Sequence, residues 1–417
     1  MESSKQNGVI PTSFFSGRAR DSRKVLELDR RLLRKLIEGM GAPAIKVALW
    51  DGEDVVSNPG ATTRMIIHNR ISLLRLIGNP LLYFGDDYSS GNIDIEGGLV
   101  NFMEAVARAM DGTGQIRRRT SPVHNWHRET FNSLSDSRKN IHHHYDLGND
   151  FYRLWLDKEM LYTCAYYPKP HISLEAAQIA KMELVCRKVR LSGGERVIEA
   201  GCGWGGLARY MAKRYGAKVR AFNISKEQVA YAKERARKEG IFGVEYIEDD
   251  YRNITGECDV FVSVGMLEHV GPNNYRRLGQ VIDSTLSDTG FGLIHSIGQD
   301  VAEPLTEWIE KRIFPGSYPP TIREMMEIFE PYGFNVLDLE NLRLHYARTL
   351  EHWLERYEAN EGEIVRMFDE SFARAWRLYL CGSIAAFRTG SLQLFQVVFT
   401  RHGNNNVPLT RHHMLEP

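Results

Sequence analysis

The sequence predicts an α/β fold built on a parallel, doubly wound sheet, and three observations indicate it. From Glu195 onward, short apolar runs alternate with helical stretches, as they do in βαβ units. The first run ends in closely spaced glycines followed by a helical pattern, which is typical of a strand–loop–helix junction. A long helical region from Tyr346 to about Arg388 separates the last two runs. We therefore expect right-handed crossovers and a long helical insertion before the last strand.

Seven runs are expected to form the strands of this sheet. They are ERVIEA, AKVRAF, GVEYIE, CDVFVSVG, GFGLIHSI, NVLDLE and FQVVFT. In an open α/β sheet, ligands bind beyond the carboxyl ends of the strands. The candidate residues follow the first five strands: Glu199 and the glycines, Asn223 to Gln228, Glu248 to Tyr251, Gly265 to His269, and His295 to Ile297. We expect them to meet in one crevice.

The length of 417 residues suggests more than one domain. A basic amphipathic helix, VLELDRRLLRKLIEGM, opens a small α+β domain over residues 25–111. The runs IKVALWDGE and TTRMIIHNRI read as its strands, and GLVNFMEAVARAM reads as its second helix. We expect a flexible tail over 1–24, a linker over 112–136, a catalytic domain over 137–402 and a flexible tail over 403–417.

Composition limits the function classes. The 53 basic and 53 acidic residues balance, which argues against a nucleic-acid partner. The five cysteines show neither metal-site nor disulfide spacing, and adjacent His142, His143 and His144 point in different directions, so no metal site is predicted. No apolar run approaches 18 residues and the start MESSKQNG is polar, so we expect a soluble, cytoplasmic protein.

The segment VIEAGCGWGGLARYM indicates a nucleotide-like cofactor. Its glycines allow close backbone approach, and the helix N-terminus offers free amides. Gly201, Gly203 and Gly206 satisfy a dinucleotide fingerprint, but Asn223 stands where an acidic residue would bind an NAD ribose. The acidic residue is Glu199, upstream of the glycines. This order favours a methyl donor over a dinucleotide.

Several strings together resemble the cyclopropane-fatty-acid synthase family: HHYDLGNDFYRLWLD, YTCAYY, IEAGCGWGGLA, DYRNI, SVGMLEHVG, IHSIG and LFQVVFTR. The resemblance runs from about Ser137 to Arg401, and more loosely through DDYSSGNIDIEGGL. It implies a class I methyltransferase with a Rossmann-like sheet. It also implies transfer of a methylene group from S-adenosylmethionine to a cis double bond of an unsaturated phospholipid acyl chain, and a homodimer.

The resemblance also implies two sets of site residues. The cofactor set comprises Tyr162, Thr163, Glu199, Gly201, Gly203, Gly205, Asn223, Ser225, Gln228, Asp250 and Tyr251. The catalytic set would bind a bicarbonate ion that removes a proton from the transferred group, and comprises Cys164, Glu268, His295, Tyr346 and the backbone of Ile297. A second cysteine common in the family is replaced here by Ser383.

Simpler roles stand beside these assignments. Glu268 and His269 could cap a helix, His295 could be a satisfied half-buried histidine, and Tyr346 and Cys164 could be packing residues. Ser225 and Gln228 also read as a capping box.

Three outcomes remain open for the reaction. They are a cyclopropane, a methylene- or methyl-branched chain, and non-catalytic lipid binding. The basic helix and Arg117, Arg118 and Arg119 suggest peripheral attraction to anionic lipid at the inner face of the membrane.

Overall fold

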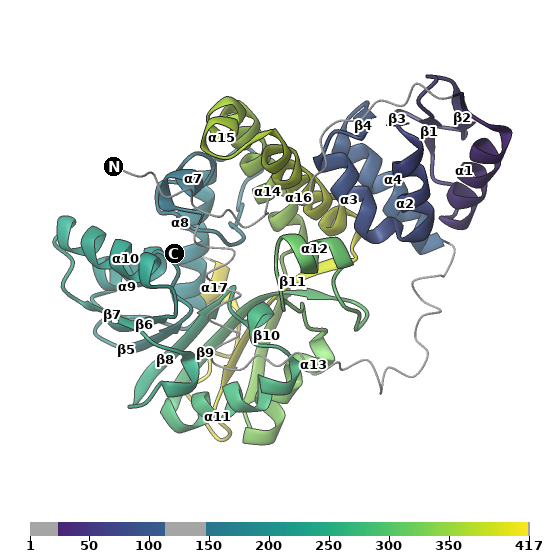
Figure 1. The fold of residues 1–417 in the computed structure, drawn as a ribbon. Coiled ribbons are helices and arrows are strands. Elements are labelled where there is room, and N and C mark those ends of the chain that lie inside the picture. Colours follow the sequence, from purple (N-terminus) through teal and green to yellow (C-terminus); the bar gives the residue numbers. More distant parts are fainter. Residues whose placement is uncertain (1–23, 113–146, 416–417) are drawn as a thin grey trace. The chain divides into compact units, whose positions relative to one another are not determined.

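A computed structural model describes residues 24–112 and 147–415 (Figure 1). The predicted N-terminal tail, the linker with its three arginines, and the three adjacent histidines lie outside these ranges. The described chain divides into two compact units. One unit contains residues 24–112, 305–315 and 350–389, and the other contains 147–304, 316–349 and 390–415.

The first unit holds a four-stranded sheet in the order β2-β1-β3-β4. Its strands are β1 (Ile45–Ala48), β2 (Asp54–Ser57), β3 (Thr63–Ile67) and β4 (Ile93–Glu96). β1 and β3 are parallel, and the other pairs are antiparallel. The helices α1 (Glu27–Gly39), α2 (Arg70–Gly78), α3 (Pro80–Ser89) and α4 (Leu99–Gly112) complete its N-terminal part. The two helices predicted here, α1 and α4, are confirmed.

One predicted strand of this unit is too long. TTRMIIHNRI forms β3 only as far as Ile67, and α2 begins at Arg70. The Asn69 side chain accepts the backbone N–H of Ser72 at 2.8 Å, so it caps the helix and ends the extended segment. The sequence pattern alone did not show this cap.

The predicted helical insertion forms three helices, α14 (Arg343–Ala359), α15 (Glu361–Met367) and α16 (Glu370–Thr389). From residue 350 to 389 the insertion belongs to the first unit, as does α12 (Glu307–Arg312). Arg374 of α16 shows the reason, because its guanidinium donates to the carbonyls of Tyr88 and Ile93 and to Asp94 at 2.7–2.9 Å. The boundaries expected from the sequence instead place the whole insertion in the catalytic domain over 137–402.

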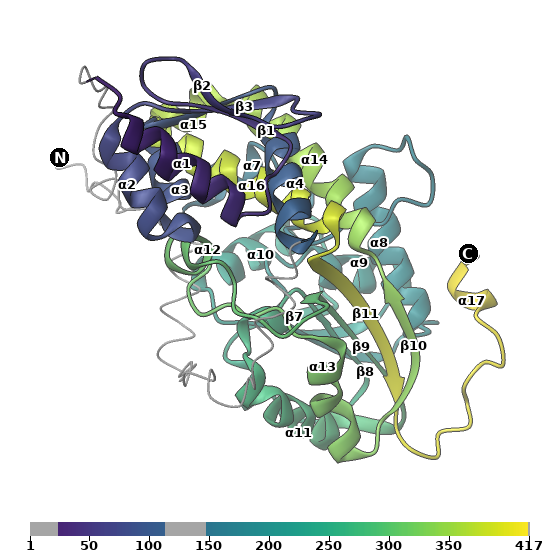
Figure 2. The same cartoon turned by 90° about the vertical axis from the view of Figure 1, so that its right-hand side faces the viewer.

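The second unit contains a seven-stranded sheet in the order β10-β11-β9-β8-β5-β6-β7. Figure 2 shows β10 and β11 beside β9 at one edge of this sheet. The strands are β5 (Arg196–Ala200), β6 (Lys218–Asn223), β7 (Val244–Glu248), β8 (Cys258–Val264), β9 (Leu286–Gln299), β10 (Asn335–Asn341) and β11 (Leu392–Thr400). β5 to β9 pair in parallel, and β11 runs antiparallel to both β9 and β10. All seven predicted strands are present, and the class I methyltransferase fold is confirmed.

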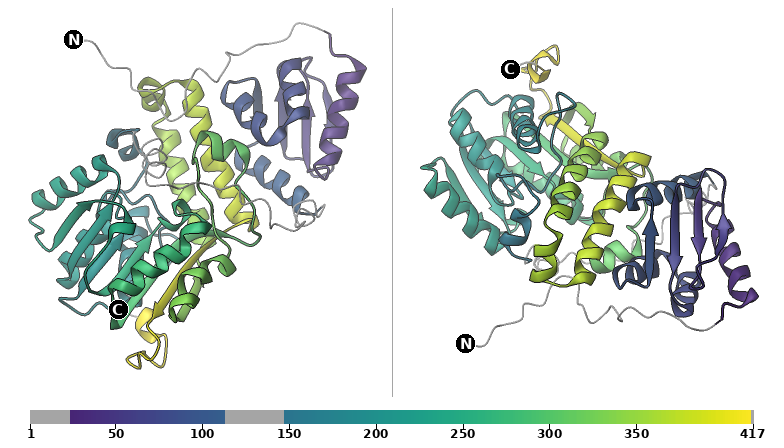
Figure 3. Two further views of the ribbon diagram at one scale, coloured as in Figure 1. Left: turned by 60° about the horizontal axis from the view of Figure 1, so that its bottom comes forward. Right: turned by 90° about the horizontal axis from the view of Figure 1, so that it is seen from above.

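Helices lie on both faces of this sheet (Figure 3), and a layer of apolar side chains covers each face. One layer includes side chains of α8 (Leu174–Lys188), α9 (Gly206–Tyr215) and α10 (Lys226–Lys238). The other includes side chains of α11 (Tyr275–Thr285) and α13 (Ile322–Phe329). Burial of the strands on both faces explains their nearly continuous apolar sequences.

The remaining elements of this unit are short. They are α7 (Asn149–Arg153), α17 (His412–Leu415) and the 3-10 turns Tyr251–Asn253, Leu267–His269, Pro272–Asn274 and Glu330–Tyr332. In the segment expected as a C-terminal tail, Arg411 forms an ion pair with Asp338 at 2.6 Å and Met414 is buried. No helix in the described ranges has both the length and the apolar character of a membrane span. All five cysteines are free and buried.

Candidate active site

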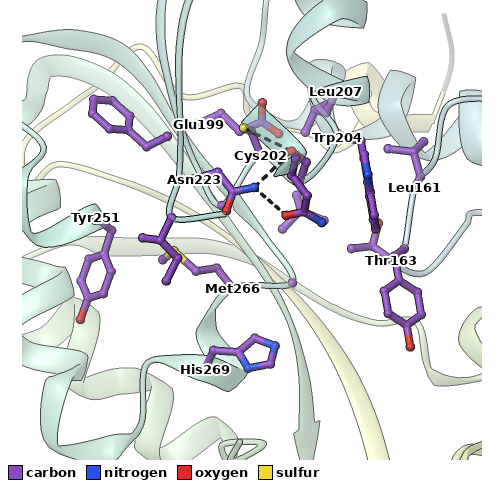
Figure 4. A pocket seen from close by; sticks show the side chains of 18 of the residues that line it. Leu161, Thr163, Glu199, Cys202, Trp204, Leu207, Asn223, Tyr251, Met266 and His269 are labelled. Atoms are coloured by element: carbon purple, nitrogen blue, oxygen red, sulfur yellow. Dashed lines mark hydrogen bonds between the residues drawn. The ribbon is translucent and has the colours of Figure 1, made fainter. Parts of the chain in front are cut away.

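A pocket lies at the carboxyl ends of the parallel strands in the second unit (Figure 4). Most of the predicted cofactor residues line it: Tyr162, Thr163, Glu199, Gly201, Gly203, Asn223, Gln228, Asp250 and Tyr251. Gly205 and Ser225 do not line the pocket. Both residues stabilise the loops that form the pocket wall.

Gly205 shapes the glycine loop. It has φ +77°, and a Cβ atom there would lie 2.6 Å from Cε1 of Tyr246. Its carbonyl accepts the Tyr246 hydroxyl at 3.1 Å. The residue therefore has to be glycine for two reasons, the left-handed backbone and the contact with the ring.

The loop after β6 presents a set of amides to the pocket. Asn223 Nδ2 donates to the Gly203 carbonyl at 3.2 Å and to Gln228 Oε1 at 2.7 Å. Ser225 Oγ accepts the backbone N–H of Gln228 at 3.4 Å, which is one half of the predicted capping box. The other half is wrong, because the Gln228 side chain pairs with Asn223. Gln228 Nε2 is buried and has no partner among the described residues, so it can donate to a ligand.

Glu199 ends β5 inside the pocket wall. Burial raises the pKa of its carboxyl to about 7, although Lys181 and Arg209 act in the opposite direction. Its Oε2 is buried without a hydrogen-bond partner among the described residues. Arg209 is itself buried and donates to the Trp204 carbonyl at 2.8 Å and to Glu159 at 2.9 Å. The buried guanidinium of Arg209 thus holds the glycine loop in place. The nearby Glu199 presents an acceptor oxygen to the pocket.

Asp250 and Tyr251 follow β7. Asp250 Oδ1 accepts the backbone N–H of Arg252 at 2.9 Å and pairs with its guanidinium at 2.7 Å. Tyr251 is buried and presents an aromatic ring to the pocket. Among the described residues, the set as a whole offers a carboxylate oxygen and an amide donor without partners, together with aromatic rings, and these groups suit the polar groups and the adenine ring of S-adenosylmethionine.

The pocket also contains residues that the sequence did not indicate as ligand-binding candidates, and Lys181 is one of them. Lys181, on α8, is buried beside Thr163 and Glu199, and nothing in the weakly amphipathic sequence of that helix marks it. His269 belongs to the run after the fourth strand that was expected in the crevice, although a helix cap was the one role named for it; it lines the pocket, and its Nδ1 lies 3.0 Å from Ser317 Oγ. Burial lowers the pKa of His269 to about 4.

The predicted catalytic residues do not line this pocket. Glu268 lies in the 3-10 turn after β8, and its Oε1 accepts the backbone N–H of Ile297 at 2.6 Å. The helix-cap interpretation of Glu268 is therefore wrong. Its Oε2 is buried without a partner among the described residues, and burial raises the pKa of the carboxyl to about 7.

His295 lies on β9, two residues before Ile297, and is only 2% exposed. Its Nδ1 is 3.1 Å from Gln396 Nε2 on the adjacent strand β11. Its Nε2 is buried and has no partner among the described residues, so it is not the satisfied, half-buried histidine of the simpler interpretation. Burial lowers the pKa of His295 to about 3, which keeps the ring neutral.

Cys164 and Tyr346 are connected through Leu342. Cys164 Sγ lies 3.2 Å from the Ala165 carbonyl and 4.0 Å from the Leu342 carbonyl, which also accepts the backbone N–H of Tyr346 at 3.1 Å. Both side chains are buried. Burial raises the pKa of the Cys164 thiol, so it stays protonated and is not a nucleophilic thiolate.

Comparison with protein-family models places the chain in a family. Residues 132–397 match the model described as mycolic acid cyclopropane synthetase, and residues 32–115 match a domain of unknown function. The chain belongs to the mycolic acid cyclopropane synthetase family. Like other members of this family, it is an S-adenosylmethionine-dependent methyltransferase.

Similar proteins indicate which kind of methyltransferase the chain resembles. The chain is 33% identical to a "Probable fatty acid methyltransferase" of Pseudomonas putida, over 89% of this chain and 96% of the relative. It is 42% identical to the "Cyclopropane-fatty-acyl-phospholipid synthase" of Escherichia coli K12, over 64% of this chain and 69% of the relative. A solved structure of the mycolic acid cyclopropane synthase CmaA1, complexed with SAH and CTAB, superposes with a TM-score of 0.61 and 28% identity, over 63% of this chain and 98% of that one.

These similarities place this chain among the cyclopropane-fatty-acid synthases and related lipid methyltransferases. The chain is therefore an enzyme, and the alternative of a non-catalytic lipid-binding protein is wrong.

Proposed function

We propose that this protein transfers a methylene group from S-adenosylmethionine to the cis double bond of an unsaturated phospholipid acyl chain and so forms a cyclopropane ring. The observation that carries the proposal is a pair of buried atoms, Glu268 Oε2 and His295 Nε2, that have no hydrogen-bond partner among the described residues and lie in the unit that holds the cofactor pocket. The similarity to the Escherichia coli synthase supports the same substrate class.

When bound, S-adenosylmethionine supplies an electrophilic methyl group on a positively charged sulfur. The π electrons of the double bond form one new bond to that carbon while the carbon–sulfur bond breaks, and the acyl chain is left as a carbocation. Removal of one proton from the added group frees the electron pair that closes the ring. The chain's own residues must therefore align the alkene, exclude water and accept a proton.

We propose that the proton acceptor is a bicarbonate ion held by Cys164, Glu268, His295, Tyr346 and the backbone near Ile297. The buried atoms Glu268 Oε2 and His295 Nε2 fit such an ion, since a neutral histidine can donate and a carboxyl whose pKa is about 7 can carry a proton beside an anion. Glu268 would then take the proton onward. In this structure the Ile297 N–H donates to Glu268, so this amide orients the carboxyl.

A phospholipid substrate lies in a membrane, so the enzyme has to reach the membrane surface. We propose a cytoplasmic homodimer that associates peripherally with anionic lipid at the inner face of the membrane. Exposed Arg31, Arg34 and Lys35 on α1 support the electrostatic part of this proposal. The first unit would provide this contact and the dimer interface.

A second candidate product is a methylene- or methyl-branched fatty acid. Two relatives that align over 89% of this chain favour it, the Pseudomonas putida protein and the "Tuberculostearic acid methyltransferase UfaA1" of Mycobacterium tuberculosis, which is 32% identical. After a hydride shift in the same carbocation, loss of a proton from the added group gives the methylene-branched chain, and a saturated methyl branch requires in addition a hydride donor. The shape of the site decides between the two outcomes.

One product analysis separates the candidates. The purified protein is incubated with vesicles of unsaturated phospholipid and S-adenosylmethionine labelled with deuterium on the methyl group, and the released fatty acids are treated with a reagent that adds to alkenes. We expect a product that retains two deuterium atoms and does not react, as a ring requires. A reactive product of equal mass would indicate a methylene branch, a product that retains three deuterium atoms would indicate a methyl branch, and absence of S-adenosylhomocysteine would contradict both candidates.

A further inference from the structure

Lys181 is a buried lysine with an unusual position in the second unit. It is 1% exposed, lies on α8 and lines the cofactor pocket. Its Nζ donates to Thr163 Oγ1 at 2.8 Å. One turn earlier, Gln178 Nε2 donates to the carbonyls of Leu161 and Thr163 at 3.2 and 2.9 Å. The helix therefore holds both the backbone and the side chain of the pocket segment around Thr163.

The charge of Lys181 has no direct counter-ion in the part of the chain that the structure describes. Within 4 Å of its Nζ there is no carboxylate oxygen of a described residue. Lys188, two turns later on the same helix and equally buried, has two, Glu340 at 2.5 Å and Asp338 at 3.5 Å. A buried ammonium whose nearest carboxylates lie beyond ion-pair distance is costly, so an anion bound in the pocket would stabilise the charge of Lys181.

The hydroxyl of Thr163 indicates where this anion lies. Because its oxygen accepts from Lys181, its single proton is available to donate elsewhere. Thr163 itself lines the pocket (Figure 4). An acceptor in the pocket can therefore bond to this hydroxyl while it also feels the charge of Lys181.

We propose that Lys181 and the Thr163 hydroxyl together bind the α-carboxylate of S-adenosylmethionine. Thr163 makes the direct hydrogen bond, and Lys181 supplies the positive charge and orients the hydroxyl. Glu199, whose unpartnered oxygen lies in the same pocket, suits the ammonium group next to that carboxylate. The proposal depends on the cofactor and not on which lipid product is formed.

The groups around Lys181 define its titration. Burial lowers the pKa of its ammonium to about 8, and the charges of Asp157, Cys164 and Glu199 oppose this decrease. Neutral His295 is also close enough to be influenced by the lysine. As pH rises through about 8, the free protein loses this charge, whereas a bound carboxylate favours the protonated form. Binding near pH 8 should therefore take up a proton, and affinity should fall at higher pH.

Calorimetry on the full chain tests the proposal with two ligands. S-adenosylhomocysteine carries the carboxylate, and 5′-methylthioadenosine is the same thioether without the amino-acid group. Lys181→Met should weaken binding of S-adenosylhomocysteine about 10- to 100-fold, because it removes the charge that strengthens and orients the Thr163 hydrogen bond, and it should change methylthioadenosine binding less than about 3-fold. Thr163→Val should show the same selectivity. Lys188→Met is the matched control, which should affect both ligands equally.

Proton uptake provides a second readout. Measured at pH 8 in buffers of different ionisation enthalpy, the wild type should take up more protons than Lys181→Met on binding S-adenosylhomocysteine, and the difference should vanish with methylthioadenosine. If Lys181→Met does not fold, Thr163→Val and the wild-type proton uptake still decide. Equal loss of both ligands, or no proton difference, would overturn the proposal. A loss seen only when bicarbonate is added would assign the charge to that ion instead.

Discussion

Glu268 and Ile297 are joined by a hydrogen bond of 2.6 Å between the carboxylate Oε1 and the backbone N–H. The bond connects the 3-10 turn after β8 to the end of β9 and leaves the other carboxylate oxygen buried without a partner in the described chain. One oxygen thus holds the structure together, and the other is available for chemistry.

This division of roles gives a prediction for Glu268→Gln. The amide oxygen can still accept the Ile297 N–H, but the side chain no longer titrates. We expect turnover to fall about 10²- to 10⁴-fold, as for loss of a general acid–base group. Calorimetry should show S-adenosylhomocysteine binding within about 2-fold of the wild type. Glu268→Ala, which also loses the hydrogen bond, should be less stable, and full activity of Glu268→Gln would remove this residue from the mechanism.

The glycine loop gives a prediction for stability. Gly205→Ala places a Cβ atom 2.6 Å from the Tyr246 ring at φ +77°, whereas Gly216→Ala, at φ +63°, meets nothing within 4 Å. We expect Gly216→Ala to lower the free energy of unfolding by about 1–2 kcal/mol, the cost of the left-handed backbone. Gly205→Ala should cost more, and it should also weaken cofactor binding. Urea unfolding measures both, and equal losses would show that the ring yields without cost.

His269 makes stability depend on pH in a defined direction. Its pKa is about 4 in the folded protein and 6.5 in the unfolded chain, so only the unfolded chain takes up a proton as pH falls below 6.5. The wild type therefore loses stability towards acid. Between pH 7.5 and 5.5 the stability of the wild type relative to His269→Gln should fall by about 1.4 kcal/mol.

Urea titrations at the two pH values check this prediction. Ser317→Ala serves as the control, since it removes the hydroxyl 3.0 Å from Nδ1 but keeps the imidazole. It should retain the pH dependence of the wild type. If His269→Gln loses stability in acid as steeply as the wild type, His269 is not protected from protonation.

The exposed basic residues of α1 give a prediction for lipid binding. Arg31→Glu with Lys35→Glu should weaken association with anionic vesicles by about fivefold for each basic residue lost near the surface, and wild-type binding should fall with salt. Sedimentation with vesicles measures this. Lys213→Glu with Lys233→Glu, on exposed positions of the second unit, makes the same change of net charge and should have less effect. Binding that does not respond to salt would contradict an electrostatic contact.

The sequence was a good guide to the large sheet. Each of its seven strands is an apolar run between turn residues, and because both faces are buried, the local pattern and the tertiary environment agree. It was a weaker guide to the first unit, where Asn69 ends a strand through a cap and Arg374 ties the insertion to residues far away in the chain. Such bonds join positions that no local pattern relates.

For the site, the sequence by itself determined that a glycine loop follows a buried strand and that polar residues follow the neighbouring strands. The order of these motifs was also enough to indicate the family, which the comparisons established. Only the tertiary structure decided which polar atoms lack a partner. Lys181 and Lys188 occur on the same helix with similar burial, yet Lys188 lies beside carboxylates from β10 and Lys181 lines the pocket. That difference depends on what packs against each residue, because the energy of a buried charge is set by its three-dimensional neighbours and not by its position in the chain.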